Sequence, residues 1–164
     1  MKHPVGITKN KLQVYIYLTG SLASKRIARQ PHLLTLAQEI FSGLVLQGTR
    51  ISMEYDMQRP IGYDYVIETL DNNIVFYGRI PKDEIYTRFV KSGKPIPTNK
   101  LSVVLIQDSE KNYELSDLWI GSLRPPRPGS SDETTDSKSY WSNHALILGD
   151  LPIQPRTITK TSPY

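Results

Sequence analysis

The run LSVVLIQ at residues 101–107 constrains the fold most, because its apolar residues would face both sides of a β-sheet. A strand with one solvent-exposed face alternates apolar and polar residues, whereas an unbroken apolar run is typical of a strand buried on both faces. A polar stretch, DSEKN, separates it from a second strand-like run at 113–120. We predict a β-hairpin with a central strand at 101–107, and alternation puts Tyr113, Leu115, Asp117 and Trp119 on one face.

Helical periodicity occupies an earlier part of the chain. From Leu33, apolar residues recur at the spacing of a broad buried helix face, at positions 33, 34, 36, 37, 40, 41, 44 and 45. Pro31 interrupts a helix or starts the next one in its first turn, where a missing N–H costs little. Gly48 is typical of a helix end. The helical part is predicted at about 21–48.

Strand-like runs follow in the rest of the chain. Residues 62–80 contain two alternating apolar runs around DNN, which predicts a hairpin, and residues 84–93 predict a further strand. Thr135 or Asp136 can begin a short helix. We expect an α+β fold, with N-terminal helices followed by an antiparallel sheet of four to five strands and a short late helix.

The length of 164 residues predicts a single domain over 1–164. Its sheet part would cover about 61–150, and an extended C-terminal tail would cover 151–164. The loop at 124–135 begins with a proline-rich stretch and continues with acidic and hydroxyl residues. A loop of this length in a compact domain is typically functional or disordered.

Composition excludes several classes of protein. The chain has no cysteine, which removes disulfides, thiolate nucleophiles and cysteine-held metals. The N-terminus lacks the apolar stretch of a signal peptide, and residues 33–48 are too short and too polar to span a bilayer. His3 and His32 are isolated, and no second histidine lies at the spacing that metal ligands on a helix or strand require. We expect a cytoplasmic protein without membrane association, metal or cofactor.

The charge of the chain is concentrated in one segment. Residues 79–100 carry a net charge of +4, which equals the net charge of the whole chain. Such a segment is a candidate footprint for an anionic partner, although lysines also protect the edges of sheets. The candidate nucleic-acid-binding residues are Arg79, Lys91, Lys94, Thr98, Lys100 and Arg124.

Two further positions carry candidate chemistry. His144 lies in the stretch YWSNHALILGD, after two aromatic residues and before an apolar run. In YTRFV, strand alternation puts Tyr86 and Arg88 on one face and Thr87 and Phe89 on the other. Both positions also have a purely structural interpretation. A histidine near a tryptophan often packs near a helix end, and residues on an open sheet face are often surface residues without a functional role.

Residues 86–121, YTRFVKSGKPIPTNKLSVVLIQDSEKNYELSDLWIG, resemble the sheet core of a superfamily of small metal-independent ribonucleases, the barnase, EndoU, colicin and RelE-like group. The resemblance extends over about 60–148 and implies helices before an antiparallel sheet, with catalytic residues on one sheet face. The chain is also similar to uncharacterised bacterial proteins with a W..HAL segment.

The resemblance implies metal-independent RNA cleavage, which needs a base, an acid and a group that stabilises the phosphorane. His144 is the candidate acid or base, because histidine titrates near neutrality. Arg88 is the candidate phosphate clamp, with Tyr86 beside it.

Three interpretations stay open. The protein is a ribonuclease-like enzyme that acts on RNA, a non-catalytic module that binds nucleic acid or a protein, or an accessory protein of a mobile element. The enzyme requires His144, Arg88 and Tyr86 to converge on a shared phosphate position. The binding module requires a continuous positive face and binding that falls steeply with salt.

Overall fold

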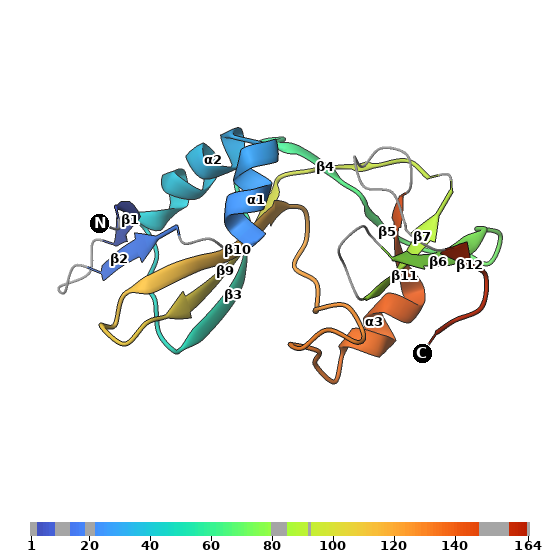
Figure 1. Cartoon of the computed structure of the whole chain (residues 1–164). Helices are drawn as coiled ribbons and strands as arrows, with labels where there is room; N and C mark the ends of the chain where they lie inside the picture. The colour runs from blue at the N-terminus through green and yellow to red at the C-terminus, as the bar shows by residue number, and fades with distance from the viewer. Residues whose placement is uncertain are drawn as a thin grey trace. The chain divides into compact units, whose positions relative to one another are not determined.

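The computed structural model describes residues 3–8, 14–18, 22–79, 85–91, 93–147 and 158–163 (Figure 1). Contacts within the chain divide it into two compact units, each built from two segments. Unit 1 comprises Met1–Gly62 and Thr98–Leu123, and unit 2 comprises Tyr63–Pro97 and Arg124–Tyr164. Each unit has its own five-stranded sheet, so we describe the units separately. Whether residues 1–164 form a single domain, as the length predicts, is not tested by this division, so it stays a prediction.

Unit 1 contains two helices and a sheet with the strand order β1-β2-β10-β9-β3. Its elements are β1 (Pro4–Thr8), β2 (Val14–Tyr17), α1 (Leu22–Arg29), α2 (His32–Phe41), β3 (Arg50–Asp56), β9 (Lys100–Gln107) and β10 (Tyr113–Ile120). Strands β2 and β10 are parallel, and the other neighbours are antiparallel. Strand β9 has a neighbour on each side, as its unbroken apolar run predicted.

The hairpin between β9 and β10 is confirmed, and its turn is held by one carboxylate. The side chain of Asp108 accepts hydrogen bonds from the main-chain N–H groups of Glu110 and Asn112, at 2.8 and 3.0 Å. Lys111 takes a positive φ of 67° between them. Aspartate favours turns because it can bond to the main chain ahead of it in this way.

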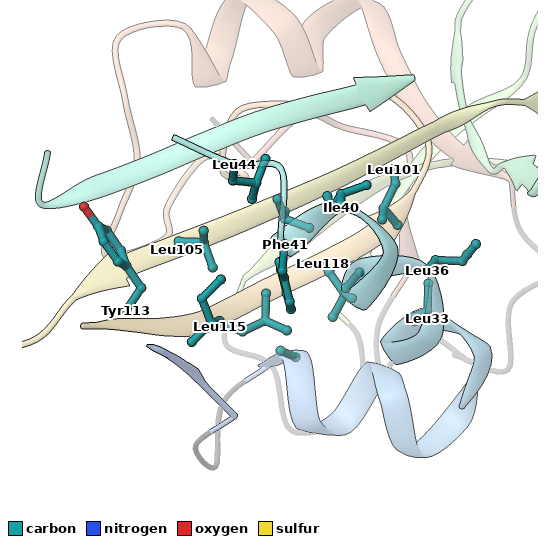
Figure 2. Close-up of a cluster of buried hydrophobic side chains, with 14 of the residues drawn as sticks. Leu33, Leu36, Ile40, Phe41, Leu44, Leu101, Leu105, Tyr113, Leu115 and Leu118 are labelled. Atoms are coloured by element: carbon teal, nitrogen blue, oxygen red, sulfur yellow. The ribbon is translucent and has the colours of Figure 1, made fainter. Parts of the chain in front are cut away.

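Apolar side chains from one face of the sheet and from α2 form the core of unit 1 (Figure 2). Leu101, Val103 and Leu105 alternate along β9 on this face, and each is fully buried. The buried residues of α2 recur at helical spacing and are Leu33, Leu36, Ala37, Ile40 and Phe41. The alternating apolar residues of β9 and the apolar residues at helical spacing in α2 therefore pack in one layer.

A β-bulge in β10 changes which residues face this core. The register shifts between Leu115 and Asp117, so Leu115 pairs with Leu105 but Asp117 pairs with Val104. The extra residue moves Asp117 to the face opposite Leu115. The prediction that Leu115 and Asp117 share one face is wrong for this reason.

Unit 2 contains one helix and a sheet with the order β12-β6-β7-β11-β5. Its elements are β5 (Val66–Glu68), β6 (Val75–Arg79), β7 (Tyr86–Val90), α3 (Ser137–Asn143), β11 (His144–Ile147) and β12 (Ile158–Thr159). Strands β7 and β11 are parallel, and the other described pairs are antiparallel. A third, two-stranded sheet pairs β4 (Gly62–Asp64) with β8 (Ile96–Thr98), where the chain passes between the units.

The α+β class is confirmed, but the prediction of one antiparallel sheet of four to five strands is wrong. The described residues form three sheets, and two of these sheets mix parallel and antiparallel pairs. The hairpin predicted around DNN is also wrong, because β7 and β11 lie between β6 and β5. Alternation identifies strands but not their partners, and these partners come from distant parts of the chain.

The helical part is shorter than the predicted 21–48. It contains α1 and α2 on either side of Pro31, and α2 ends at Phe41. Gly48 instead takes a positive φ of 98° just before β3. The late helix is confirmed, with Asp136 at its N-cap position.

Residues 151–157 and 164 of the predicted tail lie outside the described residues, and Ile158–Thr159 pair with β6 as β12. Among the described helices, none combines the length and the apolar character needed to cross a membrane.

Gly6 in β1 provides a test of the packing of unit 1. A Cβ atom there would lie 2.9 Å from Cβ and Cγ of the buried Phe41, closer than packed carbons approach. We expect Gly6→Ala to lower the free energy of unfolding by about 1–3 kcal/mol, as overpacking does. Denaturant unfolding measures this, with Gly43→Ala as control, because the nearest atom to its added Cβ lies 3.8 Å away. Equal stability of the two variants would contradict this packing.

Candidate functional site

Strands β6 and β7 place two arginines and two tyrosines on one face of unit 2. Arg79 pairs with Tyr86, and Tyr77 pairs with Arg88. Paired residues of antiparallel strands share a face, so these four side chains lie together. Thr87 and Phe89 alternate with them and are buried on the opposite face. The predicted pairing of Tyr86 with Arg88 on one face therefore agrees with the strand register.

The two arginines of this face are held differently. The Arg79 guanidinium carbon lies 4.7 Å from the centroid of the Tyr86 ring, a cation–π contact. Arg88 Nη1 donates to Thr69 Oγ1 at 2.8 Å and to the His144 carbonyl oxygen at 3.2 Å. The Nε atoms of both arginines are buried and have no hydrogen-bond partner among the described residues. We call Arg79, Tyr86 and Arg88 the arginine face.

His144 lies where α3 ends and β11 begins. Its ring stacks on the Tyr140 ring with centroids 3.9 Å apart and planes 2° from parallel. His144 Nδ1 lies 2.8 Å from the Tyr140 carbonyl oxygen. A carbonyl oxygen can only accept, so Nδ1 carries the proton of this hydrogen bond. In the neutral ring, Nε2 then has the lone pair that a base or a ligand requires.

The imidazole of His144 leaves the sheet on the face opposite the arginine face. His144 pairs with Glu68, and Leu146 pairs with Phe89, so His144 shares the face of Phe89 and Thr87. Arg88 reaches the main chain of His144, but the imidazole lies across the sheet from the Arg88 and Tyr86 side chains. The structure thus brings Arg88 and Tyr86 together and separates them from the His144 ring.

A second polar cluster includes the His144 ring's stacking partner. Arg124 Nη1 lies 3.8 Å from Asp64 Oδ1, and Asp64 Oδ1 also accepts from the Val66 N–H at 3.0 Å. Burial raises the pKa of the Tyr140 hydroxyl, the nearby Arg124 charge lowers it and the Asp64 charge raises it. Burial has the largest effect, so the pKa of Tyr140 is raised and its hydroxyl remains a neutral proton donor. We call Asp64, Arg124, Tyr140 and His144 the tyrosine–histidine cluster.

Sequence reasoning did not select Tyr140 or Asp64 as site residues. Tyr140 and His144 are four residues apart at the end of α3, a spacing that places side chains on one side of a helix. That signal was present in the sequence. The contact between Asp64 and Arg124 had no local signal, because it joins β4 to the segment that follows β10.

The remaining predicted binding residues lie in different surroundings. Lys91 and Lys94 are exposed in unit 2. Lys100 belongs to unit 1, where its Nζ lies 3.4 Å from Glu54 Oε1 and 3.8 Å from Asp56 Oδ2. Thr98 Oγ1 accepts from the Lys100 N–H at 3.0 Å. The basic segment at 79–100 is thus divided between the two units, and carboxylates offset part of its charge.

Metal chemistry has no candidate centre in the described parts of the chain, which contain no group of three potential histidine, aspartate or glutamate ligands. Both clusters contain guanidinium and phenol groups, and the tyrosine–histidine cluster adds an imidazole and the Asp64 carboxylate. The arginine face can bind an anion. The tyrosine–histidine cluster can hold and transfer a proton.

The raised pKa of Tyr140 predicts an alkaline loss of stability. A raised pKa in the folded protein stabilises it below the ordinary value of 10.0, and this contribution disappears as pH rises through the folded pKa. We expect Tyr140→Phe to lose less stability than the wild type as pH rises past 10.0. Denaturant unfolding in a pH series measures this. Tyr63→Phe, at an exposed tyrosine, is the control and should follow the wild type.

Comparison of the chain with protein-family models, with curated proteins and with solved structures gave no match. The chemistry of the two clusters in unit 2 is therefore the basis for assigning a function.

Proposed function

We propose that the protein binds nucleic acid, with RNA as the first candidate, through the arginine face of unit 2. The observation that carries the proposal is the pair of arginines on one face, each with a buried Nε that has no acceptor in the described part of the chain. The planar guanidinium group matches the geometry of a phosphate and can bind it through two parallel hydrogen bonds. Two such groups on neighbouring strands suit consecutive phosphates of a backbone.

The energetics of the arginines support this proposal. A buried donor without an acceptor costs about 1–3 kcal/mol. A side chain that turns toward an anionic ligand regains that hydrogen bond, so binding is favoured over the unbound arrangement. Tyr86 lies beside both arginines and offers an aromatic ring on which a base can stack. The exposed Lys91 and Lys94 would add long-range attraction.

Fluorescence anisotropy with a labelled single-stranded RNA tests the proposal. We expect Arg79→Gln to weaken binding to all sequences alike and to reduce the salt dependence by about one counterion, because one phosphate contact is lost. Lys138→Gln is the matched control, because Lys138 is an exposed residue of α3 with the same charge. An equal loss in both variants would mean that net charge alone drives binding, which contradicts a site on the arginine face.

A second candidate function is metal-independent RNA cleavage, and the tautomer of His144 favours it. With its proton on Nδ1, the neutral ring presents Nε2 as a base. Tyr140 is a protonated hydroxyl beside it, and Arg124 is the nearby cation. This set shares the His144 of the ribonuclease prediction, but Tyr140 and Arg124 take the roles first expected of Tyr86 and Arg88.

Incubation of the protein with RNA in EDTA tests the second candidate. We expect cleavage by the wild type and its loss in His144→Gln, which removes the imidazole but keeps a side chain that can bond to the main chain. Thermal unfolding shows whether the variant stays folded. Cleavage that persists in a folded His144→Gln variant, or none by the wild type, would remove His144 as the catalytic group and leave the binding function.

A further inference from the structure

Strand β3 is an exposed edge of the sheet in unit 1. Among the described strands, β9 is its one neighbour, and five of its seven residues are exposed. The core-facing residues Ile51 and Met53 are half-buried, and Tyr55 on the same side is 42% exposed. An edge of this length offers its main chain to another strand.

The hydrogen-bond pattern between β3 and β9 shows which main-chain groups of β3 point away from the sheet. The main-chain N–H of Gln107 donates to the Thr49 carbonyl oxygen at 2.7 Å, and the Met57 N–H donates to the Asn99 carbonyl oxygen at 2.9 Å. In an antiparallel pair, every second residue bonds to the neighbour, so the odd-numbered residues between these points face β9. The even-numbered residues direct their N–H and C=O groups away from β9. They are Arg50, Ser52, Glu54 and Asp56.

The sequence of β3, RISMEYD, is complementary to itself in the antiparallel direction. With two copies centred on Met53, Arg50 of one copy lies opposite Asp56 of the other, and Ser52 lies opposite Glu54. These residues direct their main-chain groups away from β9, so both pairs can form the hydrogen-bonded type of antiparallel pair. Ile51 then lies opposite Tyr55, which extends the apolar side of the sheet. Charges and faces both agree in this register, which gives the two charged ends of β3 opposite-charge partners.

We propose that the protein forms a homodimer in which β3 pairs antiparallel with β3 of a second copy, about a twofold axis at Met53. The pairing would join two five-stranded sheets into one continuous sheet, an isologous interface in which each contact occurs twice. Charged residues on an edge normally prevent pairing with other strands. Here opposite charges stand at the two ends of β3, so an antiparallel second copy brings opposite charges together at both ends.

Reciprocal charge reversals test the proposal in the full chain. We expect Arg50→Asp alone and Asp56→Arg alone to weaken dimerisation about tenfold or more, because each places like charges opposite one another twice. The double variant Arg50→Asp with Asp56→Arg restores both opposite-charge pairs and should dimerise like the wild type. A mixture of the two single variants should form heterodimers for the same reason. Sedimentation equilibrium measures the mass, and circular dichroism confirms folding.

A cysteine crosslink tests the register independently of charge. The chain has no cysteine, so Met53→Cys introduces a unique thiol. On the proposed axis two such residues face each other as a non-hydrogen-bonded pair, whose Cα separation of about 4.5 Å suits a disulfide. Mild oxidation should crosslink Met53→Cys but not Ser52→Cys. A wild-type monomer at all soluble concentrations overturns the proposal, as does a dimer insensitive to the single charge reversals or one that crosslinks equally at both positions.

Discussion

Burial of the interior strand β9 between α2 and its two neighbouring strands is the interaction on which unit 1 depends. Leu101, Val103 and Leu105 are fully buried, and each lies opposite residues of β3 and β10. Strand β10 follows β9 in a hairpin, but β3 comes from a distant part of the chain, so the pairing of β3 with β9 has a high entropic cost before it is stabilised. Apolar burial at β9 offsets that cost. The edge position of β3 follows from the same arrangement.

In unit 2, the parallel pairing of β7 with β11 determines the chemistry. Leu146 lies beside Phe89, which sets the start of β11 next to the arginine face and brings the His144 carbonyl to Arg88. The same register sends the His144 ring to the other face, where Tyr140 stacks on it. One strand pairing thus creates two polar clusters with separate surroundings. It also explains why a guanidinium and an imidazole that meet through the main chain do not share a site.

The sequence predicted the features that depend on local periodicity. The interior strand, the hairpin after it, the helix break at Pro31 and the late helix all follow from signals within a few residues. It did not predict the sheet order, because period-two patterns assign faces but not neighbours. The bulge at Ser116 reversed the faces of β10, although no glycine or proline marked it. Tyr86 and Arg88 share a face because alternation over five residues is local, whereas the side of His144 depends on a distant strand.

The two polar clusters of unit 2 impose different requirements on any function. Catalytic groups must come within about 3 Å of the same reacting atoms, which side chains on opposite faces of one sheet cannot do. The two proposed functions are therefore separable, since the proposed binding would use the arginine face and the proposed cleavage would use the tyrosine–histidine cluster. Ionic contacts to a backbone tolerate wider spacing than proton transfer, because they act over a Debye length in solution. The proposed binding therefore places fewer geometric conditions on the side chains of unit 2 than the proposed cleavage does.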